Sequence, residues 1–440
     1  MSNVPMTRPE EMLAEHRSEK PHAGTLLELG DGRVLTASGP TFTTSDDGGM
    51  TWSAPFKYRD TNGDPVHAGG LVRLSGGGIG AAGVLRGADN PNAYPYGPEK
   101  IDSRLMFWRS EDGGRTWEPP VRVTAEGVNA VPYKDHVVRT SSGRLVQPVY
   151  MGFGQSAGPM DALGEGGGAG KLLNGQFIRT SGHTFDPGFT CSFAYYSDDD
   201  GRTWHRNKDG NLIVPLDMSG VYSFTNEPSA TEVEPGKLLM ILRTGVGRLY
   251  QSWSYDGAET WTRPQPTSLA ASTAPAQIRT LPNGHLLVVW TQQSPEELKQ
   301  GYLRTRLSSA VSRNGGSAWE FFQNIESIHE KTRVEPGPIG RYAPAEYHFG
   351  PGRAAPERDV ANVTPAADYG IFDYPSVLVL KDRVIVAYNY RRYEEHPTRA
   401  ELALTGYEKI KVLPMSWFYG GKEPSDNPFL PRAGYRPTWG

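Results

Sequence analysis

The 440-residue chain contains a single cysteine, Cys191, so it cannot form an internal disulfide. Structural disulfides belong mainly to exported proteins, and a lone cysteine is usually a small buried apolar side chain. The chain also lacks any run of about 18 apolar residues, which a membrane-spanning helix needs. Its N-terminal segment, MSNVPMTRPEEMLAEHRSEK, has no apolar stretch of the kind found in secretory signals. These absences predict a cytoplasmic protein without a membrane span.

The chain has no strong excess of either charge. Its formal net charge is −4, from 45 Lys and Arg against 49 Asp and Glu, so neither nucleic acid nor a membrane surface is an expected partner. The Gly-rich run GEGGGAGK (164–171) lacks the ending of a phosphate-binding loop, and no zinc or calcium motif occurs. We therefore expect no cofactor and no metal. The alternative is a metal site of His22 and His67 with Asp135 or Glu227.

Glycine and proline are plentiful instead, with 52 and 36 residues, and an eight-residue pattern, S-x-D-x-G-x-T-W, recurs. Asp and Gly are typical of a tight turn between strands, and the Trp suits a buried layer between sheets. We call each copy an Asp box. Four good copies and an imperfect fifth occupy Ser45–Trp52, Ser110–Trp117, Ser197–Trp204, Ser254–Trp261 and Ser312–Trp319. Their recurrence predicts a repeated all-β module.

Each box follows an opening of two apolar segments joined by a Gly-containing turn. The sixth and last opening lacks both the glycine and a following box, but a strand within 408–418 would complete its unit. The openings lie at 22–37, 67–83, 133–150, 227–243, 275–290 and 374–390. Six four-stranded units predict a six-bladed β-propeller, which closes into a ring and protects its edges. A β-sandwich, the alternative, does not explain one box per unit.

Outside these units we expect one short helix and three long loop insertions. Thr7, Pro9 and the acidic residues after them favour a helix over 7–18. Residues 1–20 are expected to be an N-terminal extension, and residues 21–440 a single propeller domain. The expected insertions are 152–171, about 205–225 and about 324–372.

The first strand of each propeller blade lines the central axis, so residues at the starts of these strands converge on one face. An axis built only for packing would carry small or apolar residues, whereas polar residues there are typical of a binding site. The six openings place these residues at the mouth: His22, His67, Lys134 or Asp135, Glu227, Gln277 and Tyr374.

The boxes and openings resemble the sialidase superfamily, the six-bladed propellers that carry Asp boxes, over nearly the whole chain. Glu227 stands sixteen residues before Arg243 across a hairpin, a spacing that the family keeps. The resemblance implies that Glu227 polarises a tyrosine nucleophile and that Arg243 binds a substrate carboxylate. Tyr374, in the context YPSVL, is the implied nucleophile, and Arg304 is implied as a further arginine of the site. A phenol needs such a carboxylate, because its pKa of about 10 makes it a poor nucleophile.

Two positions depart from the family. The first arginine of the family's arginine triad falls at His22, and the loop that holds the family's acidic proton donor is only ASGPTF. His22, His67 or Asp135 are the candidate replacements for that donor, because histidine titrates near neutral pH. The polar residues expected to bind substrate are Arg243, Arg304, Lys134 and Gln277.

Three functions fit these residues, each with a carbohydrate as partner. The first is a sialidase-like exo-acting glycoside hydrolase for an acidic or unusual sugar. The second is a polysaccharide lyase on the same scaffold, in which His and Tyr move protons; its unsaturated product would absorb ultraviolet light. The third is a non-catalytic glycan-binding propeller, which the many titratable groups at the mouth disfavour.

Overall fold

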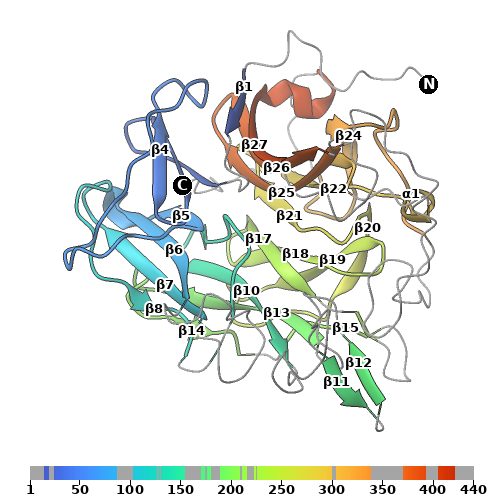
Figure 1. The fold of residues 1–440 in the computed structure, drawn as a ribbon, viewed down its shortest axis with the longest axis horizontal. Helices are drawn as coiled ribbons and strands as arrows, with labels where there is room; N and C mark the ends of the chain where they lie inside the picture. Colours follow the sequence, from blue (N-terminus) through green and yellow to red (C-terminus); the bar gives the residue numbers. More distant parts are fainter. Residues whose placement is uncertain are drawn as a thin grey trace.

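The computed structural model describes residues 14–18, 24–86, 103–125, 128, 130–153, 170–173, 176–179, 189–208, 211–215, 222–223, 225–299, 304–337, 370–392 and 405–421. This part of the chain is nearly all β-structure, with one short α-helix, α1 (Pro295–Lys299). Six antiparallel sheets form a ring (Figure 1). The predicted six-bladed β-propeller is therefore confirmed.

Each sheet is one blade, and its strands run outward from the axis in hydrogen-bonded order. Blade 1 contains β2 (Thr25–Glu28), β3 (Val34–Ser38) and β4 (Thr41–Ser45). Blade 2 contains β5 (Gly70–Arg73), β6 (Ile79–Arg86), β7 (Ser103–Ser110) and β8 (Val121–Arg122). Blade 3 contains β9 (Val138–Arg139), β10 (Leu145–Phe153), β13 (Phe189–Ser197) and β14 (His205–Arg206).

The other three blades follow the same order. Blade 4 contains β17 (Asn226–Glu234), β18 (Lys237–Arg243), β19 (Arg248–Ser254) and β20 (Gln265–Ala270). Blade 5 contains β21 (Ala276–Thr280), β22 (Leu286–Thr291), β23 (Arg306–Ser312) and β24 (Glu320–Ser327). Blade 6 contains β25 (Gly370–Val379), β26 (Arg383–Arg392), β27 (Thr405–Pro414) and, outermost, β1 (Ala14–Ser18).

The expected helix over 7–18 is wrong for residues 14–18, which form β1. This strand pairs antiparallel with β27, from Ala14 opposite Val412 to Ser18 opposite Glu408. The capping signals at the start of the chain favour a helix, but a strand at 14–18 can hydrogen-bond to the otherwise unpaired edge of β27. Residues 7–13 lie outside the described part of the chain. Segment 14–18 of the expected extension is thus built into blade 6.

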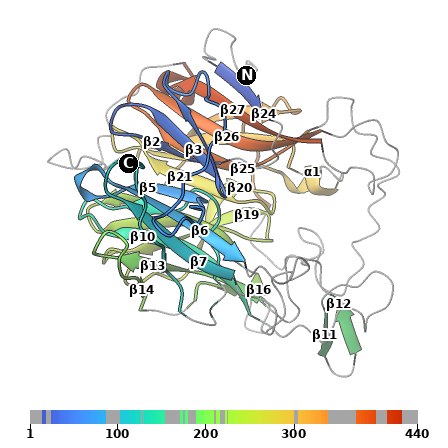
Figure 2. The same ribbon diagram turned by 60° about the vertical axis from the view of Figure 1, so that its left-hand side comes forward.

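The expected insertions contain short elements of their own. Two hairpins stand apart from the blades: β11 (Gly170–Leu173) with β12 (Gln176–Arg179), and β15 (Val214–Pro215) with β16 (Tyr222–Ser223). The β11–β12 hairpin lies at the periphery in both views (Figure 1, Figure 2). Most of 152–171 and of 324–372 lies outside the described residues.

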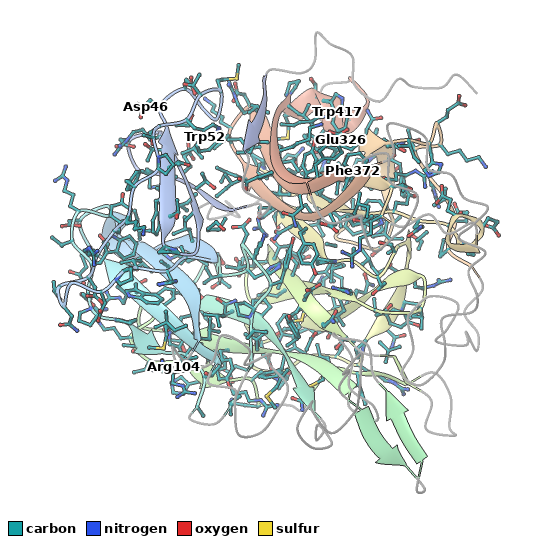
Figure 3. All side chains as sticks on the ribbon, in the orientation of Figure 1. Asp46, Trp52, Arg104, Glu326, Phe372 and Trp417 are labelled. Atoms are coloured by element: carbon teal, nitrogen blue, oxygen red, sulfur yellow. The ribbon has the colours of Figure 1, made fainter. Side chains whose placement is uncertain are left out.

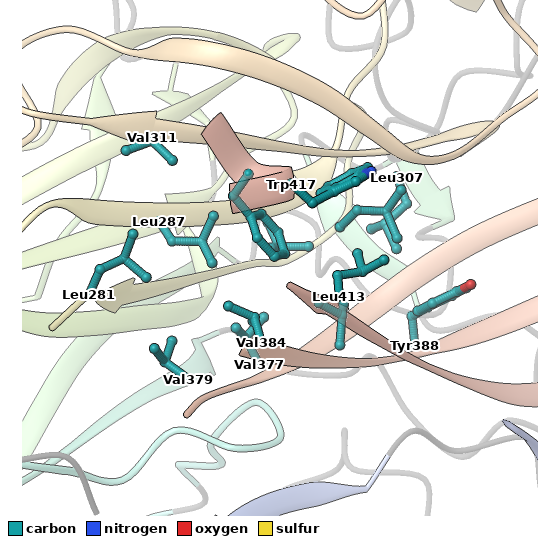
Figure 4. Close-up of a cluster of buried hydrophobic side chains, with 14 of the residues drawn as sticks. Leu281, Leu287, Leu307, Val311, Val377, Val379, Val384, Tyr388, Leu413 and Trp417 are labelled. Carbon is teal, nitrogen blue, oxygen red and sulfur yellow. The ribbon is translucent and has the colours of Figure 1, made fainter. Parts of the chain in front are cut away.

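Six buried apolar clusters fill the layers between neighbouring blades. Each Asp-box tryptophan packs into the layer shared with the preceding blade: Trp52, Trp117, Trp204, Trp261 and Trp319. Blade 6 has no box. The 3-10 helix Met415–Tyr419 supplies Trp417 to the layer between blades 5 and 6 instead (Figure 3, Figure 4). Every layer of the ring therefore holds a large aromatic side chain.

The boxes repeat one hydrogen-bond pattern, shown here by the second copy. The Oγ of Ser110 accepts from Gly114 N (2.7 Å), and Asp112 accepts from Ser110 Oγ, from Thr116 N and from Thr116 Oγ1. These hydrogen bonds, that from Thr116 N first, lower the pKa of Asp112 to about 2. Gly114 has φ of 94°, which favours glycine because it lacks a Cβ.

Replacement of Trp117 by alanine should lower the free energy of unfolding by about 3–5 kcal/mol, because it opens a cavity in the layer between blades 1 and 2. Trp117 is 1% exposed and donates Nε1–H to Gly114 O at 3.1 Å. Trp52 is only partly buried and provides the matched control, with a smaller expected loss. Denaturant unfolding of both variants measures the difference. Equal losses would contradict the packing described here.

Candidate functional site

Glu227 and Tyr374 occupy equivalent places on the innermost strands of blades 4 and 6. Each lies in a β-bulge, where pairing with the next strand shifts, and each is followed by a proline that cannot donate to the ladder. Their φ angles are 43° and 57°, in a region that non-glycine residues rarely adopt. The bulges turn both side chains out of the regular alternation of the strands, and the two meet.

Backbone strain from positive φ angles is concentrated around Glu227 and Tyr374. Seven non-glycine residues of the described chain have positive φ. Besides Glu227 and Tyr374, these seven include Asp135 (58°) and Arg304 (56°), which contact the same region. Residues held in such conformations persist only where the surrounding structure fixes them, and they cluster at functional sites.

Glu227, Arg243 and Tyr374 form a closed hydrogen-bonded set. The Tyr374 hydroxyl donates to Glu227 Oε1 at 3.0 Å. Arg243 Nη1 donates to Glu227 Oε2 and lies 3.4 Å from Tyr374 Oη. Glu227 and Arg243 come from paired strands of one blade, whereas Tyr374 comes from across the ring. The arginine therefore holds the carboxylate in place while the carboxylate accepts from the phenol.

The charges of this set act on the phenol in opposite directions. Burial raises the pKa of Tyr374, and the negative charge of Glu227 raises it further, while Arg243 and Arg304 lower it. Burial would lower the pKa of Arg243, but Glu227 and Tyr374 raise it above its ordinary value. The phenol is thus protonated at neutral pH, and its hydrogen bond to Glu227 is a direct path for that proton to leave.

Arg304 covers the ring of Tyr374, with its guanidinium carbon 5.7 Å from the ring centroid. Its Nη1 donates to Asp373 Oδ2 at 2.7 Å, and its Nη2 donates to Thr273 O at 2.8 Å. Thr273 Oγ1 also accepts from Arg243 Nε at 3.3 Å. The threonine thus links the two arginines beside the phenol.

Two residues from the loop before β9 also reach Tyr374. The ring of Tyr133 lies 5.5 Å from the ring of Tyr374, and its hydroxyl donates to Pro375 O at 2.8 Å. Lys134 Nζ lies 6.0 Å from the Tyr374 ring centroid. This Nζ is buried and has no hydrogen-bond partner among the described residues.

Asp135 lies at the axis, where other groups occupy both of its carboxylate oxygens. Oδ1 accepts from Thr25 Oγ1 at 2.7 Å, and Oδ2 accepts from Arg279 Nη2 at 2.7 Å. Arg279 Nε also donates to Val377 O at 3.1 Å, and Asp135 N donates to Gly69 O. Burial raises the pKa of Asp135, while Arg279 and Thr25 lower it. This network joins blades 1, 2, 3, 5 and 6.

The other predicted site residues are placed differently. Gln277 Nε2 donates to Lys134 O at 3.2 Å and so supports the loop that carries Lys134. His67 stacks on Trp108 of its own blade, with ring centroids 6.1 Å apart, and burial lowers its pKa. Among the described residues, no hydrogen bond, ion pair or ring contact joins His67 to Tyr374. His22 lies outside the described residues.

Sequence reasoning missed three residues of the site: Asp373, Arg279 and Tyr133. Asp373 had a usable signal, since Asn226-Glu227-Pro228-Ser229 and Asp373-Tyr374-Pro375-Ser376 share one pattern and mark the two bulges. Arg279 sits in an ordinary amphipathic strand, and its spacing from other residues gives no indication of its partner.

The described part of the chain contains no group of three or more His, Cys, Asp or Glu arranged to hold a metal ion. No helix in that part is long and apolar enough to cross a membrane. Among the described residues, the groups that contact the Tyr374 side chain are the carboxylate of Glu227, the guanidinium groups of Arg243 and Arg304, the ammonium of Lys134 and the ring of Tyr133.

Comparison with known proteins agrees with this architecture. Residues 94–386 match a family model described as a BNR repeat-like domain. A crystal structure of a Dyadobacter fermentans protein of unknown function is 17% identical, with a TM-score of 0.52, over 93% of this chain and 100% of that chain. The Hadza microbial sialidase Hz136 is 15% identical, with a TM-score of 0.53, over 93% of this chain and 67% of that one.

Trypanosoma rangeli sialidase in complex with the inhibitor DANA is 14% identical, with a TM-score of 0.50, over 93% of this chain. The match covers 56% of the trypanosomal chain, so this protein spans little more than half its length. At these identities the likeness shows the fold alone. The predicted resemblance to the sialidase superfamily is confirmed at that level.

The Asp135–Arg279 pair should behave as a coupled unit in stability measurements. Arg279→Met leaves a buried carboxylate without its cation and should cost about 3–5 kcal/mol of unfolding free energy. Asp135→Asn in the Arg279→Met background should recover part of that loss, because it removes the uncompensated charge. Denaturant unfolding of the two single variants and the double variant gives the coupling. Additive losses would contradict a direct interaction.

Proposed function

Because the chain belongs to the family of BNR repeat-like domains, we propose that it is a sialidase-like, exo-acting glycoside hydrolase with Tyr374 as nucleophile and Glu227 as its base. The observation that carries the proposal is the hydrogen bond from Tyr374 Oη to Glu227 Oε1, at 3.0 Å. A general base must lie within this distance of the proton that it removes. The bulges and the positive φ angles that hold the pair together support a role beyond packing.

We propose an acidic sugar as the substrate, because cations surround the phenol. Arg243 hydrogen-bonds to it, Arg304 covers its ring, and Lys134 lies near the same ring. Arginine suits a planar carboxylate because its fork can donate two parallel hydrogen bonds. A tyrosine nucleophile also suits an anionic substrate, because the neutral phenol does not repel the substrate as it binds, whereas a negatively charged carboxylate nucleophile would repel it.

In the proposed reaction, the phenol oxygen attacks the anomeric carbon as its proton moves to Glu227, and the glycosidic bond breaks as the leaving oxygen takes a proton from an acid of the site. Water then attacks the same carbon and gives one proton to the conjugate base of that acid, while the phenol oxygen leaves and recovers its own proton from Glu227. Two displacements at one centre give net retention of configuration. Arg243 donates hydrogen bonds to both groups, so it stabilises the negative charge that passes from the carboxylate to the phenol oxygen until that oxygen bonds to carbon.

A panel of 4-methylumbelliferyl glycosides tests the substrate class. The panel holds N-acetylneuraminic, glucuronic and galacturonic acids together with the neutral sugars glucose and galactose. Release of fluorescent product from the acidic members only is the expected result. Cleavage of the neutral members alone would contradict an acidic substrate. An unsaturated product absorbing in the ultraviolet would indicate a lyase in place of a hydrolase.

Tyr374→Phe should lower kcat for the cleaved glycoside by about 10²–10⁴-fold, because the variant has no nucleophilic oxygen. Glu227→Gln should lose nearly as much, and the double variant should be little worse than either single variant, because the pair acts as a unit. Steady-state kinetics, with binding measured by calorimetry, separates turnover from affinity. Tyr255→Phe, at an exposed tyrosine (66%), is the matched control. Unchanged turnover in Tyr374→Phe would contradict the proposal.

A further inference from the structure

Among the described residues, Lys134 is the cation of the site whose charge no neighbour neutralises by direct contact. Arg243 is paired with Glu227, and Arg304 is paired with Asp373 at 2.7 Å. Lys134 Nζ carries three donors, is buried, and has no hydrogen-bond acceptor among the described residues. A buried unpaired ammonium costs free energy, so its retention beside a reactive phenol calls for a ligand that pairs with it.

The backbone around Lys134 is held tightly enough to aim its side chain. The preceding residue, Tyr133, is tied to blade 6 by the hydrogen bond to Pro375 O (2.8 Å), and the following residue, Asp135, is tied to Arg279. Gln277 Nε2 donates to Lys134 O at 3.2 Å. Lys134 is therefore presented to Tyr374 by fixed neighbours on both sides in sequence and by blade 5 beneath it.

The carboxylates around Tyr374 already accept hydrogen bonds from other side chains of the protein. Glu227 already accepts from Tyr374 and Arg243, and Asp373 accepts from Arg304. Both oxygens of Asp135 accept from other side chains, so that carboxyl cannot turn to a ligand without breaking the axial network. Of the described residues whose side chains contact the phenol ring, Lys134 is the one that combines a transferable proton with unused donors.

We propose that Lys134 is the proton donor to the leaving group, in the role that family resemblance would assign to an aspartate absent here. This inference rests on the proposed function, since it adds the acid to the Tyr374–Glu227 pair. In the first step, a proton passes from Lys134 Nζ to the glycosidic oxygen as its bond to the anomeric carbon breaks and the phenol oxygen bonds to that carbon. In the second step, the neutral amine takes a proton from the attacking water, which restores the ammonium.

The charge environment of Lys134 suits this exchange. Burial lowers its pKa to about 8, against the carboxylates of Glu408, Asp373 and Glu227, which raise it. Glu408, from β27, accepts from the backbone N–H of Gly24. An acid works best when its pKa lies near the working pH, and an ordinary lysine, with a pKa of about 10.4, is too weak an acid for efficient donation.

The leaving group provides the sharpest test. A 4-nitrophenolate leaving group departs without being protonated, whereas methanol leaves only if its oxygen takes up a proton. We therefore compare the 4-nitrophenyl and methyl glycosides of the acidic sugar that the wild-type enzyme cleaves. Lys134→Met should lower kcat/KM for the methyl glycoside by about 10²-fold or more and for the 4-nitrophenyl glycoside by less than about tenfold. Lys134→Arg should give the same split, because arginine keeps the charge but holds its proton too tightly to donate it.

Three controls decide what the split means. Lys57→Met, at an exposed lysine far along the chain, should leave both rates unchanged. Full activity of Lys134→Arg on the methyl glycoside would show that only the charge matters and would overturn the proposal. A split of this kind in His22→Ala, with none in the Lys134 variants, would assign the donor to His22 and would also overturn it.

Covalent trapping separates this inference from the proposed function. A fluoro-substituted glycosyl fluoride of the same sugar needs no acid, because fluoride leaves unaided, and it should label Tyr374 in both the wild-type enzyme and Lys134→Arg. Mass spectrometry of the labelled peptide reads this out without turnover. Wild-type protein that is not labelled at Tyr374 would refute the nucleophile itself. Labelling of Tyr374 in both proteins, without the leaving-group split, would refute only the role of Lys134.

The pH profile gives an independent reading. Because the ammonium is the active form, kcat/KM for the methyl glycoside should fall as the pH rises through about 8, the pKa of Lys134. This falling limb should disappear for the 4-nitrophenyl glycoside and in Lys134→Arg. An identical falling limb in Lys134→Arg would assign it to another group and count against the proposal.

Discussion

The ion pair between Asp135 and Arg279 at the axis is the interaction on which both the ring and the site depend. Blades of a propeller contact only their neighbours through apolar layers, but this pair links blade 3 to blade 5, and its further hydrogen bonds reach blades 1, 2 and 6. A buried ion pair repays its desolvation only when its remaining hydrogen-bonding groups are also satisfied. Here backbone carbonyls and a threonine hydroxyl provide that satisfaction, so the pair fixes the positions of five inner strands at one point.

The same network sets the geometry around the phenol. Asp135 cannot move without disturbing Arg279, and Lys134 and Tyr133 immediately precede it in the chain. Those two residues contact the ring of Tyr374, so the axial pair holds one wall of the site while the bulges of β17 and β25 hold the other. Local backbone preferences are violated on both walls, and the surrounding sheets supply the stability that maintains the strain.

Sequence alone predicted the parts that repeat. Each Asp box encodes its own turn through side-chain hydrogen bonds, so the boxes account for five blades without long-range information, and the sixth opening adds the last blade. Glu227 and Arg243 could likewise be predicted, because one hairpin fixes their spacing. Tyr374 was predicted from its place at the start of the sixth opening and from the family resemblance of its YPSVL context. The strand at 14–18 could not be predicted from the sequence, because its partner is the edge of β27 and its own sequence carries helical signals. Arg279 was missed for a similar reason: its role comes from the closure of the ring, which puts it beside a residue 144 positions away.

Charge conservation explains why a tyrosine, and not a third carboxylate, suits position 374 in the proposed reaction. A carboxylate there would lie beside those of Glu227 and Asp373, and the three negative charges would repel one another and an anionic sugar. With tyrosine, activation moves a proton from Tyr374 to Glu227 within one hydrogen bond, so the total charge of the pair does not change. Arg243, which contacts both members, meets the same charge before and after the transfer. The site can therefore be assembled in advance around a neutral nucleophile, with little reorganisation required when it reacts.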